Sequence, residues 1–275
     1  MSIFYVPEYA IMHNTKIKKY PDGDLKITVA SKPIFKERGF ELIKDDKKSS
    51  KPKNMDNPSR DDSIKRAKDK VYDIVRMNDF DNFVTLTFDN EKINRSCTDE
   101  ISDKFKNFLS NMVQRNGIKY LFIPEYHKKD NAIHFHGFIN GDIQLVDSGT
   151  VDAKGFDKPI KIETAKRYKI PLEECRTVYN MPQWKLGFST VKKTYGNKIH
   201  TAKYITKYIS KDMKKIFGSY YFAGGKDLIR EVPYHLTDTD FSAFEADTEI
   251  YCPAIATSFK YRDTSNQKGG FDEIQ

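Results

Sequence analysis

The most distinctive feature of the hydrophobic pattern is a pair of short apolar runs, Tyr120–Ile123 and Ile133–Ile139, separated by a polar connector at 128–131. This pattern predicts two strands joined by a hairpin turn. Successive side chains of a strand point to opposite faces, so His134 and His136 would share one face of the sheet. The bulky hydrophobic residue between them would anchor the strand from behind.

The same kind of pattern predicts a strand at Phe83–Phe88, where β-branched and aromatic residues favour a central position, and another at Lys185–Val191. An N-terminal hairpin is predicted from Lys16–Tyr20 and Leu25–Ala30, which flank a turn sequence. Residues 141–182 show no regular pattern.

Helical periodicity marks three further segments, in which apolar residues recur at intervals of three and four. The first contains Ile64, Ala67, Val71, Ile74 and Val75. The second contains Ile101, Phe105, Phe108, Leu109, Met112 and Val113; a capping-box sequence at 96–99 would begin it and Gly117 would end it. The third contains Ala202, Ile205, Ile209 and Ile216.

Length and composition narrow the class of protein. The 275 residues suffice for one sizeable domain with appendages or for two small ones. A net charge of +8 with 16 tyrosines and 19 phenylalanines suits a nucleic-acid partner, through phosphate neutralisation and base stacking. A basic protein without such a partner explains the charge equally well. The lysine-rich linker at 44–61 could follow a phosphate backbone or simply be solvated.

Other features exclude several classes. The three cysteines, Cys97, Cys175 and Cys252, have no metal-binding or disulfide spacing and predict a reduced, intracellular protein. We expect no membrane segment and no signal peptide. The sequence at Gly224–Lys226 lacks the upstream glycine of a Walker A motif and is followed by Asp227, so an ATP-driven helicase is not expected in this chain.

The histidine hairpin is a candidate metal site. Opposed residues of an antiparallel pair share a face, so Glu125 would join His134 and His136 if it lies opposite His134. A single strand histidine is usually structural, but two at this spacing beside a carboxylate favour metal binding. His127 is a rival third ligand. We favour Glu125, because a hard, phosphate-handling cation prefers oxygen ligands.

The second candidate cluster repeats the pattern Tyr-x-x-Lys, first as Tyr204 and Lys207 and then as Tyr208 and Lys211. The tyrosines are four residues apart, so on a helix they lie on one face, one turn from each other. Aromatic packing and solvated cations explain such pairs by default. The pattern becomes specific only in combination with the histidine hairpin.

Taken together, Phe83–Phe88, His134-Phe135-His136 and Tyr204–Lys211 resemble, in order and spacing, the three motifs of HUH endonucleases. The closest similarity is to the two-tyrosine rolling-circle replication initiators of phages and plasmids, over about residues 60–235. The resemblance implies an α+β fold with a central antiparallel sheet and flanking helices, ferredoxin- or RRM-like. Residues 1–59, the N-terminal hairpin and basic linker, and 236–275, a C-terminal extension, lie outside it.

The resemblance also implies a reaction. Mg²⁺ or Mn²⁺ held by His134, His136 and Glu125 would orient a phosphate of single-stranded or hairpin origin DNA. A tyrosine would attack it and become joined to the 5′ end. A free tyrosine phenol has a pKa of about 10 and is a weak nucleophile at neutral pH, so Lys207 or Lys211 would offset developing charge. The host would supply helicase and polymerase, in the cytoplasm of a bacterial cell.

Three alternatives remain open from the sequence. The same chemistry could serve a transposase or a conjugative relaxase. Two histidines and one carboxylate also describe a non-haem iron oxygenase, which would leave the tyrosines and the basic charge unexplained. The sheet could also be an inactive module that binds single-stranded DNA.

Overall fold

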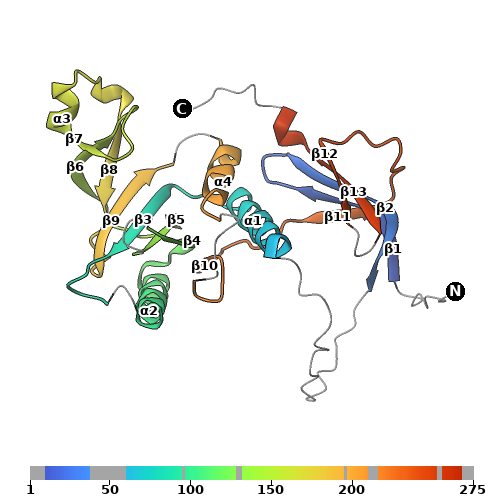
Figure 1. The fold of residues 1–275 in the computed structure, drawn as a ribbon, viewed down its shortest axis with the longest axis horizontal. Coiled ribbons are helices and arrows are strands. Elements are labelled where there is room, and N and C mark those ends of the chain that lie inside the picture. The colour runs from blue at the N-terminus through green and yellow to red at the C-terminus, as the bar shows by residue number, and fades with distance from the viewer. Residues whose placement is uncertain are drawn as a thin grey trace, which may run out of the picture. The chain divides into compact units, whose positions relative to one another are not determined.

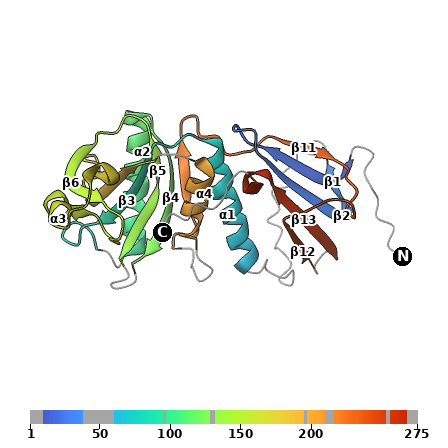
Figure 2. The same ribbon diagram turned by 90° about the horizontal axis from the view of Figure 1, so that it is seen from above.

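The computed structural model describes residues 10–37, 60–94, 97–127, 132–194, 197–209, 216–252 and 256–267. The chain forms two compact units, drawn in Figures 1 and 2: residues 58–230, and residues 1–57 together with 231–275. The predicted linker at 44–61 falls almost entirely outside the described residues, as does the predicted turn at 128–131.

The unit formed by residues 58–230 has the predicted α+β architecture. Its eight-stranded sheet has the order β10-β4-β5-β3-β9-β8-β6-β7, and its paired strands are antiparallel. In that order the strands span Phe222–Gly225, Lys119–Tyr126, Ile133–Asn140, Asn82–Phe88, Gly187–Lys193, Arg176–Asn180, Val146–Asp152 and Ile160–Lys161. The helices are α1 (Arg60–Met77), α2 (Thr98–Asn116), α3 (Ile162–Arg167) and α4 (Lys198–Thr206), with a 3₁₀ turn, η1, at Leu172–Glu174. The predicted central position of Phe83–Phe88 is confirmed, because β3 lies between β5 and β9.

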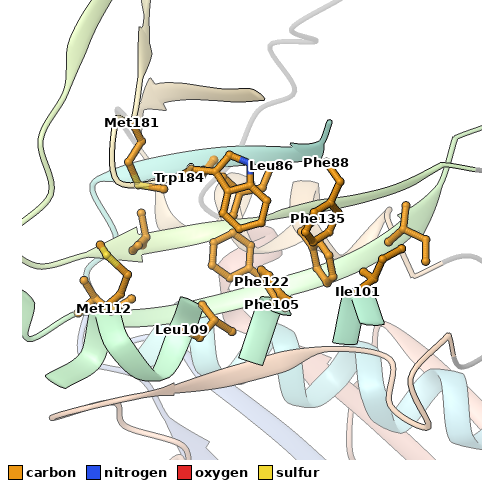
Figure 3. Close-up of a cluster of buried hydrophobic side chains, with 14 of the residues drawn as sticks. Leu86, Phe88, Ile101, Phe105, Leu109, Met112, Phe122, Phe135, Met181 and Trp184 are labelled. Carbon is orange, nitrogen blue, oxygen red and sulfur yellow. The ribbon is translucent and has the colours of Figure 1, made fainter. Parts of the chain in front are cut away.

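One face of this sheet packs on α2 and forms the main core. Figure 3 shows Phe105 of α2 beneath Phe122, Phe135 and Trp184. The rings of Phe105 and Phe135 are stacked with centroids 3.6 Å apart, and both side chains are fully buried. Phe135 therefore anchors the back of the strand that carries both histidines, as its alternation with them predicts.

The two ends of α2 differ from each other in how they are capped. The predicted capping box is wrong: the helix begins at Thr98, and Cys97 at the N-cap makes no side-chain capping hydrogen bond. The predicted end at Gly117 is confirmed. This glycine has φ +58°, a left-handed conformation that lacks the Cβ penalty of other residues, and its N–H donates to the carbonyl of Val113.

Helices α1 and α4 pack on each other and bring aromatic side chains to the opposite face of the sheet. Phe80, just after α1, stacks on Phe138 of β5 with centroids 5.5 Å apart. An ion pair joins Lys198 at the start of α4 to Asp79, beside the beginning of β3. The hydrogen bond from Lys198 lowers the pKa of the Asp79 carboxyl below its ordinary value. These contacts hold α4 against the strands that carry the histidines.

Two parts of this unit differ from the sequence prediction. Residues 141–182, which show no regular pattern, contain β6, β7, α3 and β8. Helix α4 is also shorter than its apolar stripe predicts, because it ends at Thr206 and Ile216 does not belong to it. The chain continues from α4 in a tighter turn, in which the N–H of Tyr208 donates to the carbonyl of Ile205 and that of Ile209 to Thr206.

The other unit is a five-stranded antiparallel sheet of order β11-β1-β2-β13-β12, built from both ends of the chain. Its strands span, in that order, Tyr234–Thr237, Ala10–Lys19, Leu25–Glu37, Thr257–Asp263 and Thr248–Cys252, and a 3₁₀ turn, η3, follows at Thr264–Gln267. The predicted N-terminal hairpin is confirmed as β1 and β2. None of the helices in the described ranges is both long and apolar enough to cross a bilayer.

Candidate active site

The candidate site lies on the face of the eight-stranded sheet opposite α2, and it begins with the two histidines of β5. His134 and His136 project from the same face, with nearly parallel rings whose centroids are 6.3 Å apart. The adjacent strand β3 contributes a hydroxyl to each of them. Thr87 Oγ1 lies 2.9 Å from Nδ1 of His134, and Thr85 Oγ1 lies 3.1 Å from Nδ1 of His136. Because both Nδ1 atoms are engaged in this way, a metal ion would have to be bound through Nε2.

The two candidates for the third ligand both lie beside this pair. Glu125 is paired directly opposite His134 in the register of β4 and β5, which confirms the predicted placement. Its carboxylate lies 3.1 Å from Nε2 of His136. The ring of His127 lies 5.0 Å from that of His134, at the other end of the pair. Glu125 therefore contacts the nitrogen through which His136 would bind a metal, while His127 flanks its neighbour.

The donor set suits a divalent cation in chemistry and in position. Two imidazoles and a carboxylate share one face, and their threonine partners orient the rings. Among the residues that the structure describes, no three His, Cys, Asp or Glu side chains converge closely enough to enclose an ion in the arrangement seen. Contact between Glu125 and His136 alone amounts to a two-residue site, and the side chain of His134 completes the proposed set.

The two tyrosines meet this face from the end of α4. Their hydroxyl oxygens lie 2.9 Å apart, within hydrogen-bond distance. The ring of Tyr208 stacks on the imidazole of His136 with centroids 4.2 Å apart. Phe83 of β3 contacts both phenol rings, that of Tyr204 at 5.5 Å and that of Tyr208 at 6.3 Å. The structure thus brings together the motifs that the sequence separates by about seventy residues of intervening strands and turns.

The two phenols differ in environment. Tyr204 is 47% exposed, whereas Tyr208 is partly buried between Phe83 and His136. Burial raises the pKa of the Tyr208 phenol well above its ordinary value, and the hydrogen bond with Tyr204 and the Glu125 carboxylate act in the same direction. Lys207 caps α4 and is exposed, and Lys211 lies outside the described residues.

Comparison with known families places this geometry in a biological context. Residues 81–213 match the family model of the replication-associated protein ORF2. This segment is a replication-associated domain of the ORF2 family. It begins immediately before β3 and includes the histidine pair and both tyrosines. Comparisons with curated proteins and with solved structures gave no match. The family match supports a role in the initiation of replication.

Sequence reasoning missed three contributors to the site of this ORF2-family domain. Thr85 and Thr87 contact the histidines, and Phe83 supports the tyrosines. All three alternate along β3, so they share the face of His134 and His136. The signal was present in the two-residue period of Phe83–Phe88, but threonine and phenylalanine are common in strands and carry no chemical message by themselves.

Proposed function

We propose that the ORF2-family domain nicks and rejoins single-stranded DNA at a replication origin through a covalent link between a tyrosine and the 5′ phosphate. The observation that carries this proposal is the meeting of two tyrosine hydroxyls, 2.9 Å apart, with the ring of Tyr208 stacked on His136. Phenols can act as nucleophiles, and a carboxylate with two imidazoles is a typical ligand set for a divalent metal ion. The family match supplies the link to replication.

In the proposed reaction, the oxygen of a tyrosine attacks a backbone phosphorus in line with the departing 3′ oxygen. The tyrosine O–P bond forms and the P–O3′ bond breaks; the phenol proton is lost, and the 3′ oxygen takes up a proton to leave a hydroxyl. The number of phosphoester bonds is unchanged, so the reverse reaction rejoins the strand without ATP. Phe83 positions both phenols, since its ring contacts each of them.

The metal in this proposal is Mg²⁺ or Mn²⁺, held by His134, His136 and Glu125. When bound, such an ion polarises the phosphoryl group and lowers the cost of the charge that develops on its oxygens. Lys207, exposed at the end of α4, lies one residue before Tyr208 and could offset charge on the phosphoryl oxygens or on a phenolate. Lys211 is proposed for the same role on its spacing alone.

Two tyrosines fit the requirements of rolling-circle replication. One cleavage starts a round and a second ends it, while the first covalent bond still holds the strand. Tyr204 is the more exposed phenol, so we propose that it attacks first and that Tyr208 follows after leaving the ring of His136. Since the chain lacks a Walker A motif, a host helicase and polymerase are the proposed partners.

A cleavage assay tests the proposal. Labelled single-stranded DNA containing the origin is incubated with the full chain, with Mg²⁺ or Mn²⁺ and then with chelator. We expect site-specific nicking with the metal and none with chelator. Absence of any nicking under both conditions would contradict the proposal. Parallel substrates carrying transposon-end hairpins separate an initiator from a transposase, because an initiator nicks only the origin strand.

A further inference from the structure

We propose that Phe188 is a stacking platform for a base of the DNA strand that enters the candidate active site. This inference rests on the proposed function and assigns a substrate contact to a residue outside the three motifs. Phe188 is 69% exposed, the most exposed large hydrophobic side chain in the parts of the chain that the structure describes. Single exposed hydrophobic residues are common, so its position relative to the site carries the argument.

The strand register places Phe188 in the same row as the catalytic face. Thr87 of β3 pairs with Phe188 of β9 on one side and with His134 of β5 on the other. His134 in turn pairs with Glu125 of β4. Directly opposed residues of antiparallel strands point to the same face. The row Phe188, Thr87, His134 and Glu125 therefore runs across one surface of the sheet.

The distance along this row suits a neighbouring nucleotide. One strand, β3, separates β9 from β5. Adjacent strands lie about 4.8 Å apart, so the backbones at Phe188 and His134 are roughly 10 Å apart. Nucleotides of a duplex strand rise about 3.4 Å each, so a base at most about three nucleotides from the scissile phosphate reaches the ring.

The backbone beneath Phe188 is closely packed against its neighbour. An ideal Cβ on Gly187 would lie 2.1 Å from the carbonyl oxygen of Thr87, so only glycine allows β9 to approach β3 this closely. Gly187 pairs with Phe88, which is buried in the core. The ring of Phe188 thus projects from a central strand at a fixed register rather than from a loop, and a fixed ring loses little freedom when a base stacks on it.

The chemistry of the ring selects the partner. A phenyl ring offers a flat apolar surface without a hydrogen-bonding group, which suits the π-face of any base and gives no sequence code. The net charge of +8 favours a polyanion at the same surface. A single strand joins both features, because its phosphates are charged and its bases are free to stack. We therefore assign the ring to single-stranded DNA rather than to a protein partner.

The test compares two oligomers that carry the same number of phosphates, an oligothymidylate and an abasic oligomer, each fluorescently labelled. Binding to the full chain is measured by anisotropy without divalent metal, so that no cleavage occurs. Removing one base stack costs roughly 5- to 150-fold in affinity. We expect Phe188→Val, which keeps a β-branched strand residue, to weaken oligothymidylate binding within that range. Binding of the abasic oligomer should stay unchanged, and Phe188→Trp should retain the affinity of the native chain.

Tyr168→Ala is the matched control. Tyr168 is 59% exposed and follows α3, next to β7 at the far edge of the same sheet, so its loss should leave both affinities unchanged. Equal oligothymidylate affinity for Phe188→Val and the native chain would overturn the inference, as would equal weakening for both oligomers. If the native chain nicks origin DNA while Phe188→Val binds normally, only the inference fails. If the native chain neither binds nor nicks single-stranded DNA, the proposed function fails as well.

Discussion

Replacing Thr87 with valine tests whether the hydroxyls of β3 prepare the histidines for metal binding. Thr87 Oγ1 lies 2.9 Å from Nδ1 of His134. When Nε2 binds a cation, Nδ1 carries the proton and donates it to this hydroxyl. Valine keeps the β-branched shape of threonine and removes only the hydroxyl. The backbone carbonyl of Thr87 still accepts its hydrogen bond from the indole of Trp184 at 3.1 Å, so the strand should stay in place.

The size of the effect follows from this single contact. A neutral hydrogen bond contributes about 1 kcal/mol net, or about fivefold, and loss of a partner behind a metal-binding histidine usually costs about 10- to 100-fold. We therefore expect Thr87→Val to raise the Kd for Mn²⁺, measured by calorimetry, by roughly tenfold. Thr87→Ser keeps the hydroxyl and is the control, with an expected change below about twofold. An unchanged Kd in Thr87→Val would refute the reasoning that the hydroxyl orients His134.

Three further predictions concern the same unit. His134→Ala or His136→Ala should abolish nicking while circular dichroism stays native, and nicking should decline as the pH falls below about 6.5, where imidazoles become protonated and cannot bind metal; full activity in either variant would exclude it as a ligand. Glu125→Gln should require much more metal for nicking whereas His127→Ala should change little, and the reverse order in a metal titration would identify His127 as the ligand. The pKa of Asp79 is lowered in the folded protein, so its ion pair should stabilise the fold fully above about pH 4 and lose this effect as the pH falls further; melting temperatures of Asp79→Asn and the native chain should differ at pH 7 and converge in acid, and a constant difference would contradict this.

The part of the fold that sequence predicts well is the part with a strict period and one buried face. The alternation of His134, Phe135 and His136 places the histidines on one face, and the short connector places Glu125 opposite His134. Residues 141–182 could not be predicted in this way. Their strand β6 is largely exposed or half-buried and includes polar residues and Gly149, so it lacks the apolar alternation that marks a strand.

Contacts between elements that are distant in the sequence were also beyond prediction. The hydrogen bond from Thr87 to His134 depends on the register of β3 against β5, which pair across the whole of α2 and β4. The sheet of the second unit joins β2 to β13, more than two hundred residues later. Helical spacing placed Tyr204 and Tyr208 on one face, but the tight turn that follows α4 and the stacking of Tyr208 on His136 come from packing against the sheet.

The most direct test of the proposed reaction is the detection of its covalent intermediate. Labelled single-stranded origin DNA is incubated with Mn²⁺ and the native chain, Tyr204→Phe, Tyr208→Phe or the double variant; adducts are resolved on a denaturing gel and the modified residue is identified by mass spectrometry. Phenylalanine keeps each ring against Phe83 and removes only the nucleophile. We predict an adduct on the remaining tyrosine in each single variant and none in the double variant. An adduct of undiminished yield in the double variant would contradict the account, because the nucleophile would then lie elsewhere in the chain.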